Sequence, residues 1–305
     1  MRTRIINKLI QYAQKDPRVF LVTGDAGYGV LDEYQRRFPH RFLNLGVAEQ
    51  NMMSFSAGLA LAGYKVFLYN IIPFLLYRAY EQLRDDICYQ RLAVTLIGIG
   101  SGFTYAPQGM THYSLEDISL ALTIPNLVIL SPSDPYEAEG CMRFAFKSNK
   151  PVYIRIAKSA EPLIHTRPVA DVRLSLVVKK GRDVAVLFHG SIASEVMDAC
   201  QDLEYEPTLI SMPMLRPVNF LALKRQLRGI HTIITVEEHF VQGGLGSILE
   251  EWIIRKNLPF QLKKLGVKNE FVHRINNTAG MRQAYGICQR HIREAIIKAF
   301  LKKDV

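Results

Sequence analysis

Residues 44–63 read Asn44-Leu-Gly-Val-Ala-Glu-Gln-Asn-Met-Met-Ser-Phe-Ser-Ala-Gly-Leu-Ala-Leu-Ala-Gly63, which predicts a helix of small and apolar residues after a short apolar strand. The run contains a single acid, Glu49, near its beginning. Acids are common in the first turn of a helix, because the helix dipole favours them there. An acid held in an apolar site needs a partner, which would instead mark a functional position. The residues alone leave both interpretations open.

Strand-like and helix-like segments alternate on both sides of this run. The alternation predicts an α/β fold of two doubly wound domains with mostly parallel sheets. We expect the first domain over residues 1–160, a proline-containing linker over 161–181 and the second domain over 182–305. The expected strands are Val19–Thr23, Lys65–Tyr69, Leu92–Ile97, Asn126–Leu130 and Pro151–Lys158 in the first domain, and Asp183–Phe188, Thr208–Ser211, Thr232–Val236 and Gln261–Leu265 in the second.

The composition is that of a globular protein, since 49% of the 305 residues are hydrophobic and 22% are charged. The four cysteines are far apart, and without a signal peptide we expect reduced thiols and a cytoplasmic location. The apolar stretch 54–76 is interrupted by Gly63, Lys65 and Pro73, which argues against a membrane span. The net charge of +10 is scattered and lacks interleaved aromatics, which argues against a nucleic-acid partner. Phosphorylated substrates or an acidic partner chain suit this charge.

Several polar residues follow expected strands, at the edge of a parallel sheet where ligands bind. Asp25 lies in a glycine-bearing turn, Gly24-Asp-Ala-Gly27, and the alternative is a plain strand-to-helix turn. Arg155 and Lys158 end the last strand of the first domain, where they suit an anion site or form a solvated basic pair. His112 lies in a long glycine-rich loop, where a lone histidine is more often structural.

The motif Gly46-Val-Ala-Glu-Gln-Asn-Met52, followed by Ala57-Gly-Leu-Ala60, resembles the glutamate motif of the transketolase family. This family includes deoxyxylulose-phosphate synthases and, more distantly, the beta subunits of 2-oxo-acid dehydrogenases. The resemblance implies a pyrimidine-binding domain in which Glu49 hydrogen-bonds N1′ of the aminopyrimidine ring of thiamine diphosphate. Glu49 would then be both a catalytic and a cofactor-binding residue, while the cofactor carries the chemistry.

A second motif, Arg78-Ala-Tyr-Glu-Gln82, resembles the family's Arg-Ala-aromatic-Asp-Gln run, and transketolases carry aromatics in this segment that pack on the aminopyrimidine. Aligning on Arg78 puts Leu75 at the stacking position, whereas a gap of one residue puts Phe74 and Tyr77 there. By helical spacing alone, an aromatic stripe is by default core. We expect the aromatics to bind the cofactor, since a flat ring packs better against a heteroaromatic face.

The loop motif Gly109-x-Thr-His112 resembles the family's Gly-x-Thr-His-Gln segment, which implies that His112 faces the substrate and helps with proton transfer or hydroxyl binding. Tyr113 departs from the family's Gln, and Gln108 stands where an Asp often recognises a sugar hydroxyl. Transketolases proper also carry a His near Gly100 of this chain. These departures concern the substrate-binding positions, of which Gln108 is one.

Other positions take roles from the same resemblance. Asp25 falls where related enzymes place loop residues near the thiamine ring, and Arg155 and Lys158 fall where basic residues hold the substrate phosphate. Residues 237–246, Glu-Glu-His-Phe-Val-Gln-Gly-Gly-Leu-Gly, resemble a run of the transketolase C-terminal domain that shapes the dimer rather than the chemistry. We therefore expect His239 to be structural.

One element of the family is missing from this chain. The family's Gly-Asp-Gly motif, with an Asn further on, holds Mg²⁺ and the diphosphate, and Gly24-Asp-Ala26 is not that motif. We expect no metal ligands here. The resemblance implies a split transketolase, in which a separate subunit holds most of the Mg²⁺ and diphosphate site and this chain forms a homodimer within an α₂β₂ assembly.

The implied reaction is thiamine-diphosphate-dependent transfer of a two-carbon ketol unit between sugar or sugar phosphate substrates, active only with the partner subunit. Two alternatives stay open. One is an enzyme resembling deoxyxylulose-phosphate synthase or the beta chain of a 2-oxo-acid dehydrogenase, which first decarboxylates a 2-oxo acid. The other is a non-catalytic regulatory partner chain that has kept the fold.

Overall fold

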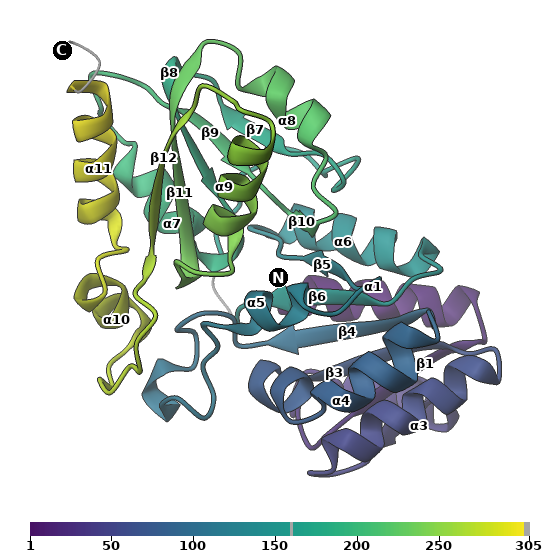
Figure 1. Ribbon diagram of the computed structural model, residues 1–305. Helices are drawn as coiled ribbons and strands as arrows, with labels where there is room; N and C mark the ends of the chain where they lie inside the picture. The colour runs from purple at the N-terminus through teal and green to yellow at the C-terminus, as the bar shows by residue number, and fades with distance from the viewer. Residues whose placement is uncertain (159–160, 302–305) are drawn as a thin grey trace.

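The computed structural model describes residues 1–158 and 161–301, which build two sheets with helices on both faces (Figure 1). The first sheet has seven strands in the order β10-β5-β6-β4-β3-β1-β2. All its pairs are parallel except that of β10, which lies antiparallel on β5. The strands are β1 (Val19–Thr23), β2 (Phe42–Asn44), β3 (Lys65–Ile71), β4 (Val94–Ile99), β5 (Val128–Leu130), β6 (Val152–Ile156) and β10 (Met214–Arg216).

The second sheet has five strands in the order β12-β11-β8-β9-β7, and only the pair of β7 with β9 is antiparallel. Its strands are β7 (Leu176–Lys179), β8 (Asp183–Phe188), β9 (Thr208–Ser211), β11 (Ile230–Phe240) and β12 (Gln261–Val267). Because β7 falls within the range 161–181, the expected linker includes the first strand of this sheet. The expected domain ends at residues 160 and 305 lie outside the described residues.

Helices pack on both faces of each sheet, as Figure 1 shows. On the first sheet, α1 (Arg2–Lys15) and α6 (Pro135–Lys147) cover one face, and α3 (Glu49–Leu61) and α5 (Asp117–Leu122) cover the other. On the second, α7 (Ala193–Ala199) and α11 (Gln289–Leu301) lie opposite α8 (Phe220–Gln226) and α9 (Leu245–Arg255). The remaining α-helices are α2 (Asp32–Arg37), α4 (Tyr80–Gln82) and α10 (Thr278–Ala284). The predicted α/β class with two mostly parallel sheets is confirmed.

The sequence explains why these elements form where they do. All six residues of β4 are buried, as expected for a central strand of a parallel sheet covered on both faces. In α3, Met52, Met53 and Ala57 face the core, and the helix ends before Gly63, whose φ of +93° suits glycine. The apolar stretch 54–76 is thus divided among α3, β3 and a π-helical turn, η2 (Pro73–Tyr77).

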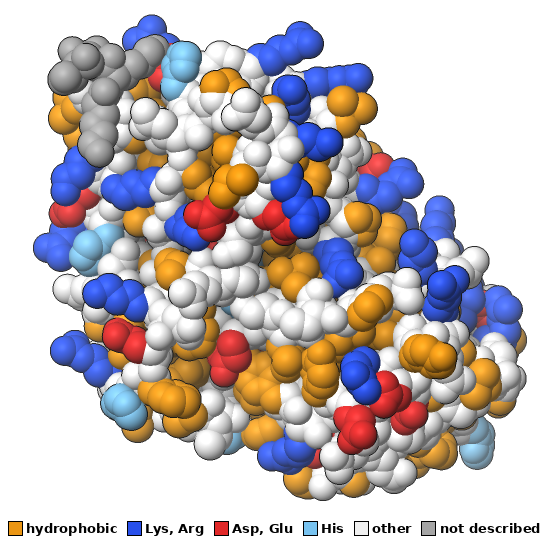
Figure 2. Space-filling model, viewed as in Figure 1, with side chains coloured by type: hydrophobic (Ala, Val, Ile, Leu, Met, Phe, Trp, Pro, Cys, Tyr) orange, Lys and Arg blue, Asp and Glu red, His pale blue; other side chains and the backbone are white. Residues whose placement is uncertain are grey.

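Charged side chains are distributed over the surface, and the helices are those of an α/β protein. Lys and Arg side chains are spread over the face shown in Figure 2, with Asp and Glu among them. Within the described ranges, no helix has both the length and the apolar character needed to cross a bilayer.

A buried ion pair of the first domain is hydrogen-bonded to the second domain. Arg155 Nε, on β6, donates a hydrogen bond to Asp117 Oδ2 at 2.8 Å, and Arg155 Nη2 donates to the backbone carbonyl of Glu238, on β11, at 2.9 Å. The hydroxyl of Tyr153 donates to the same Asp117 oxygen at 2.8 Å. Although burial raises the pKa of Asp117, the Arg155 guanidinium and further neighbours hold that pKa below its usual value. The Asp117 carboxylate therefore depends on Arg155 for its charge.

The linker is held at the beginning of α6 by hydrogen bonds. Asp134 caps this helix, because its Oδ1 accepts from the amide of Glu137 at 2.8 Å, while its Oδ2 accepts from the amides of Ile164 and His165, each at 3.1 Å. Glu137 in turn accepts from the amide of Ser133 at 2.7 Å and lies 2.7 Å from Nε2 of His165. Asp134 is therefore both the N-cap of α6 and the anchor of the linker.

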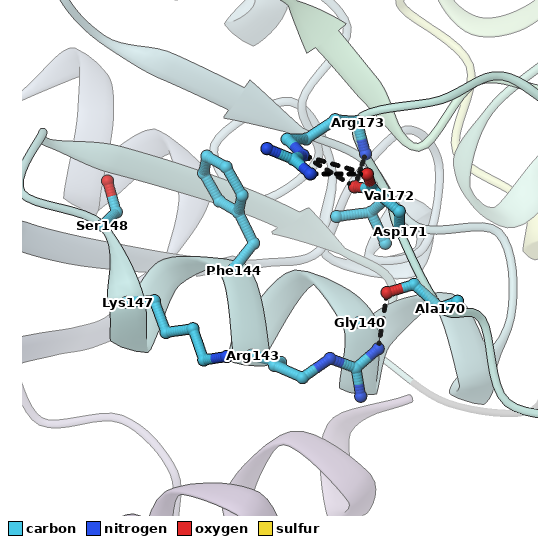
Figure 3. Close-up of a pocket in the computed structure, with 9 residues that line it drawn as sticks. All are labelled: Gly140, Arg143, Phe144, Lys147, Ser148, Ala170, Asp171, Val172 and Arg173. Carbon is cyan, nitrogen blue, oxygen red and sulfur yellow. Dashed lines mark hydrogen bonds and ion pairs between the residues drawn. The ribbon is translucent and has the colours of Figure 1, made fainter.

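Further along, the linker packs beside the carboxyl-terminal half of α6 and encloses a surface pocket of 380 Å³ (Figure 3). Arg143 reaches from α6 to the carbonyls of Val169 and Ala170, and Arg173 forms an ion pair with Asp171 at 2.8 Å. None of the residues that line this pocket is among the predicted site residues.

We expect Asp117→Asn to lower the free energy of unfolding by about 3–5 kcal/mol, because it leaves a buried guanidinium without its counter-ion. Urea denaturation followed by circular dichroism measures the change. Asp171→Asn is the control, since it breaks an ion pair at the surface and should leave stability nearly unchanged. Equal losses in the two variants would contradict this account of the domain junction.

The contact between His165 of the linker and Glu137 predicts a dependence on pH. Although burial lowers the pKa of His165, the hydrogen bond and charge of Glu137 raise it above its usual value overall. A group whose pKa rises on folding stabilises the fold below its unfolded pKa, and that contribution is lost as the pH rises through the folded pKa. The decrease in Tm caused by His165→Gln should therefore be larger at pH 5.5 than at pH 8.5. The exposed His231→Gln variant is the control and should lower Tm equally at both pH values. An equal decrease for His165→Gln would contradict a charged contact between His165 and Glu137.

Candidate functional site

The predicted site residues of the first domain follow parallel strands at one edge of its sheet. Asp25 follows β1, Glu49 follows β2, Phe74 follows β3, His112 follows β4 and Lys158 follows β6. Since parallel strands end at the same edge, side chains far apart in the sequence are brought to one side of the sheet. The contacts described below connect most of them.

Glu49 is the first residue of α3 and is only 2% exposed. Arg78 Nη1 donates a hydrogen bond to Glu49 Oε2 at 2.9 Å, whereas Oε1 has no hydrogen-bond partner among the described residues. The carboxylate lies at the positive end of the helix dipole, and no side chain caps this helix. Glu49 is therefore a nearly buried acid that is partly satisfied and has one oxygen left for a ligand.

Phe74 continues this group of contacts. It lies in η2, with the Arg78 guanidinium carbon 4.5 Å from the centre of its ring. The same ring stands edge-on to His112, with ring centres 5.2 Å apart. Such widened π-helical turns are frequent at functional sites. Glu49, Arg78, Phe74 and His112 thus form one continuous group from three elements.

The two other candidates for stacking are placed differently. Leu75 is fully buried in the core, so its side chain has no surface to offer a ligand. Tyr77 packs against the same core, its hydroxyl is buried, and burial raises its pKa well above the usual value. Of the three residues that the alignment left open, Phe74 is the one in contact with Arg78 and His112.

His112 is carried by a loop between β4 and α5 that the second domain holds in place. Thr111 Oγ1 lies 2.8 Å from His112 Nδ1, which orients the ring and leaves Nε2 without a hydrogen-bond partner among the described residues. The hydroxyl of Tyr113 donates to the carbonyl of Val272 at 3.0 Å, and Thr278 Oγ1 donates to the carbonyl of Phe103 at 3.1 Å. Contacts from the other domain therefore fix the position of His112.

The departures at Tyr113 and Gln108 have different structural settings. Burial raises the pKa of Tyr113 to about 12, so its hydroxyl remains a donor for the second domain and does not face a ligand. Gln108 ends the 3₁₀ turn η4 (Ala106–Gln108) and is exposed. Tyr105 lies over Gly100, whose φ is +93°, and its ring fills the space that a side chain there would need. Gln108 is accessible, whereas Tyr113 is structural.

The two basic residues in and after β6 differ in their exposure to solvent. Arg155 is 1% exposed, and its Nε and Nη2 donate to Asp117 and to the Glu238 carbonyl, so the structure places it in a buried ion pair and not at the surface where a substrate phosphate was expected. Lys158 is exposed, and its Nζ lies 5.2 Å from the centre of the Tyr105 ring, close to the His112 loop. Strand-end position alone did not distinguish a buried cation from an accessible one.

Asp25 lies in the turn that follows β1. It is exposed, with a φ of +54°, and its amide donates to Asn44 Oδ1 at 2.8 Å. The same Asn44 oxygen accepts from the amide of Gly46 at 3.0 Å. Asn44 therefore ties the Asp25 turn to the loop that leads into Glu49.

The sequence reasoning did not assign Arg78, Tyr105 or Asn44 to the site. Arg78 had a usable signal, because it lies four residues after Phe74 and such residues face one another along a helix. The contact between Tyr105 and Gly100 depends on the loop's path and had no such signal. The buried residues Glu237 and His239 lie elsewhere: Glu237 accepts from the amides of Leu245 and Gly246 at 2.7 and 2.9 Å, a structural role at the start of α9.

These residues fit a flat heteroaromatic ring with a ring nitrogen. Glu49 offers one free carboxylate oxygen in a nearly buried position, and Phe74 offers an aromatic surface beside it. His112 and Lys158 lie further along the same edge. In the part of the chain that the structure describes, no group of three His, Cys, Asp or Glu residues is arranged to hold a metal ion.

Comparisons with known proteins identify both domains. Residues 1–162 match the family model of the transketolase pyrimidine binding domain, and residues 175–292 match that of the transketolase C-terminal domain. One of the subunits of an apulose-4-phosphate transketolase from Actinobacillus succinogenes is 35% identical over 256 residues, which are 83% of this chain and 82% of that protein.

Two further similarities differ in coverage. A 1-deoxy-D-xylulose-5-phosphate synthase from Histophilus somni is 30% identical over 87% of this chain, but the chain spans only 43% of the synthase. A solved structure described as a split gene transketolase, an inactive beta4 tetramer, superposes with a TM-score of 0.87 at 27% identity and covers 98% of this chain and 97% of its own. The chain is therefore homologous over its length to the corresponding polypeptides of split transketolases.

We expect Tyr113→Phe to lower the free energy of unfolding by about 1 kcal/mol, because it leaves the Val272 carbonyl without its donor. Tyr205→Phe is the matched control, since its hydroxyl has no hydrogen bond among the described residues and its ring is partly exposed. Chemical denaturation of both variants measures the difference. An unchanged stability for Tyr113→Phe would contradict the anchoring of the loop through this hydroxyl.

Proposed function

This chain belongs to the transketolase family, and from that premise we propose that it is one subunit of a two-chain, thiamine-diphosphate-dependent transketolase. The proposed reaction transfers a two-carbon ketol unit between sugar phosphates. The observation that carries the proposal is the group formed by Glu49, Arg78, Phe74 and His112 at the edge of a pyrimidine-binding domain.

Each of these side chains has a role in the proposed site. When bound, thiamine diphosphate supplies the carbon nucleophile that takes up the two-carbon unit. Glu49 offers its free Oε1 to N1′ of the aminopyrimidine, and Phe74 packs against the ring. His112, oriented by Thr111, holds or moves a proton at a substrate hydroxyl through Nε2.

The substrate side of the site is formed by the exposed residues Lys158 and Gln108. The ammonium of Lys158 suits a substrate phosphate, and its place beside Tyr105 keeps it near His112. Gln108 provides an amide in place of a carboxylate for a sugar hydroxyl. Asp25 borders the cofactor side through its link to Asn44.

A separate subunit completes the proposed enzyme. The chain covers almost all of a split-gene structure but less than half of a single-chain synthase, which supports a division of the enzyme between two polypeptides. The partner would hold Mg²⁺ and the diphosphate, since hard cations prefer several oxygen ligands. We place the active assembly, α₂β₂ with this chain as a homodimer, in the cytoplasm.

A second candidate reaction is favoured by the 30% identity to a deoxyxylulose-phosphate synthase. In that case the donor is a 2-oxo acid, and carbon dioxide leaves before transfer to the aldehyde. The donor distinguishes the two reactions, since ketol transfer from a ketose phosphate releases no carbon dioxide. If the chain and its partner together bound no cofactor, that result would instead support the role of a non-catalytic regulatory chain.

The test is to co-express this chain with a neighbouring reading frame that encodes Gly-Asp-Gly followed by Asn, and to titrate thiamine diphosphate with Mg²⁺. We expect the cofactor to bind tightly to the pair and not to either chain alone. Ketose phosphates and 2-oxo acids are then supplied as donors with an aldehyde acceptor. Absence of cofactor binding by the pair would contradict the proposed enzyme.

In the active pair, we expect Glu49→Gln to lower kcat by at least about 100-fold, because an amide cannot exchange a proton with N1′. Glu81→Gln is the control, since Glu81 is an exposed acid close by in the sequence and should leave kcat unchanged. Steady-state kinetics at saturating cofactor measures both. Full activity of Glu49→Gln would remove Glu49 from the proposed mechanism.

A further inference from the structure

Arg78 contacts two of the side chains proposed to receive the cofactor. Its Nη1 donates to Glu49 Oε2 at 2.9 Å, and its guanidinium carbon lies 4.5 Å from the centre of the Phe74 ring. Glu49 begins α3, whereas Phe74 lies in η2, so no backbone hydrogen bond fixes one relative to the other. Arg78 touches both.

The chemistry of arginine suits this double contact. The planar guanidinium donates hydrogen bonds from its edge and packs on an aromatic ring through its face, and a lysine ammonium cannot do both. Arg78 uses the edge for Glu49 and the face for Phe74. It therefore sets where the carboxylate lies relative to the ring, and it occupies only one of the two carboxylate oxygens.

We infer that Arg78 is a positioning residue for thiamine diphosphate: it holds Glu49 by one oxygen and Phe74 by its face, so that the free Glu49 oxygen meets N1′ while the ring packs on the aminopyrimidine. This inference rests on the proposed function. In this role Arg78 acts through its neighbours, since its Nη1 pairs with Glu49 and its face packs on Phe74.

A purely structural role predicts something different. The Arg78 side chain is 46% exposed, and ion pairs with such a partner contribute little to folding. If Arg78 only stabilised the fold, its replacement would affect all ligands of the site equally. If it positions Glu49, its replacement should affect the part of the affinity that depends on N1′.

The experiment compares thiamine diphosphate with its N1′-deaza analogue, in which a C–H replaces N1′, using calorimetric titration of the assembled pair with Mg²⁺. The ratio of the two Kd values isolates the contact between Glu49 and N1′, since every other group is shared. In the wild-type pair we expect the analogue to bind at least about tenfold more weakly, the effect of one hydrogen bond that involves a charged group.

The variants are Arg78→Gln and Arg78→Lys. We expect Arg78→Gln to reduce the preference for N1′ to within about threefold, and Arg78→Lys to recover only part of it, because the ammonium can pair with Glu49 but lacks the flat face for Phe74. Arg84→Gln is the matched control: Arg84 is also half-exposed and paired with an acid, Asp85, at 2.9 Å, and its loss should leave the preference unchanged. Thermal unfolding of each variant checks that the fold is intact.

The outcomes separate this inference from the proposed function. A wild-type preference that persists in Arg78→Gln and Arg78→Lys overturns the role of Arg78 and leaves the proposed function standing. A wild-type pair that binds the cofactor and the analogue equally well overturns the assignment of Glu49, and the positioning role falls with it. Loss of the preference in Arg78→Gln but not in Arg84→Gln is the result that supports positioning.

Discussion

The buried pair of Arg155 and Asp117 is the constraint on which the rest of the structure depends. Two charged groups that are 1% and 0% exposed are tolerable only when their donors and acceptors are matched, and part of the match comes from the Glu238 carbonyl of the other domain. Separating the domains would leave a buried charge incompletely satisfied. The relative position of the two domains is therefore fixed by electrostatics as well as by apolar packing.

The same constraint reaches the candidate site through the loop before α5. Asp117 begins α5, so the loop that carries His112 is held at its end by the ion pair and along its length by Tyr113 and Thr278. Glu238 of the second domain also contacts the beginning of this loop. Its carboxylate pairs with Arg282 and fills the space beside Gly102, whose φ is +58°. The second domain thus holds the His112 loop in place without adding a residue to the contacts described around Glu49.

Much of this arrangement could be predicted from the sequence, and the failures have physical reasons. The strands Val19–Thr23, Asp183–Phe188 and Thr208–Ser211 match the structure residue for residue, because buried parallel strands are continuous apolar runs between turns. The burial of Arg155 could not be predicted, because a basic residue at a strand end looks the same in sequence whether it meets solvent or a buried acid. The partner that decides the matter, Asp117, is 38 residues away. The β7 strand was missed because it is short and only partly buried at a sheet edge.

The order of strands in space explains why the site is open on one side. The sheet runs β6-β4-β3-β1-β2, so Lys158, His112, Phe74, Asp25 and Glu49 follow the ends of adjacent strands in that same order. A linear row of side chains can contact one edge of a ligand but cannot surround it. Glu49, which retains a free oxygen at the end of this row, lies where a ligand must be enclosed by groups from outside the sheet. This arrangement supports the proposal that groups from outside this sheet, such as those of a partner subunit, form the opposite wall of the site.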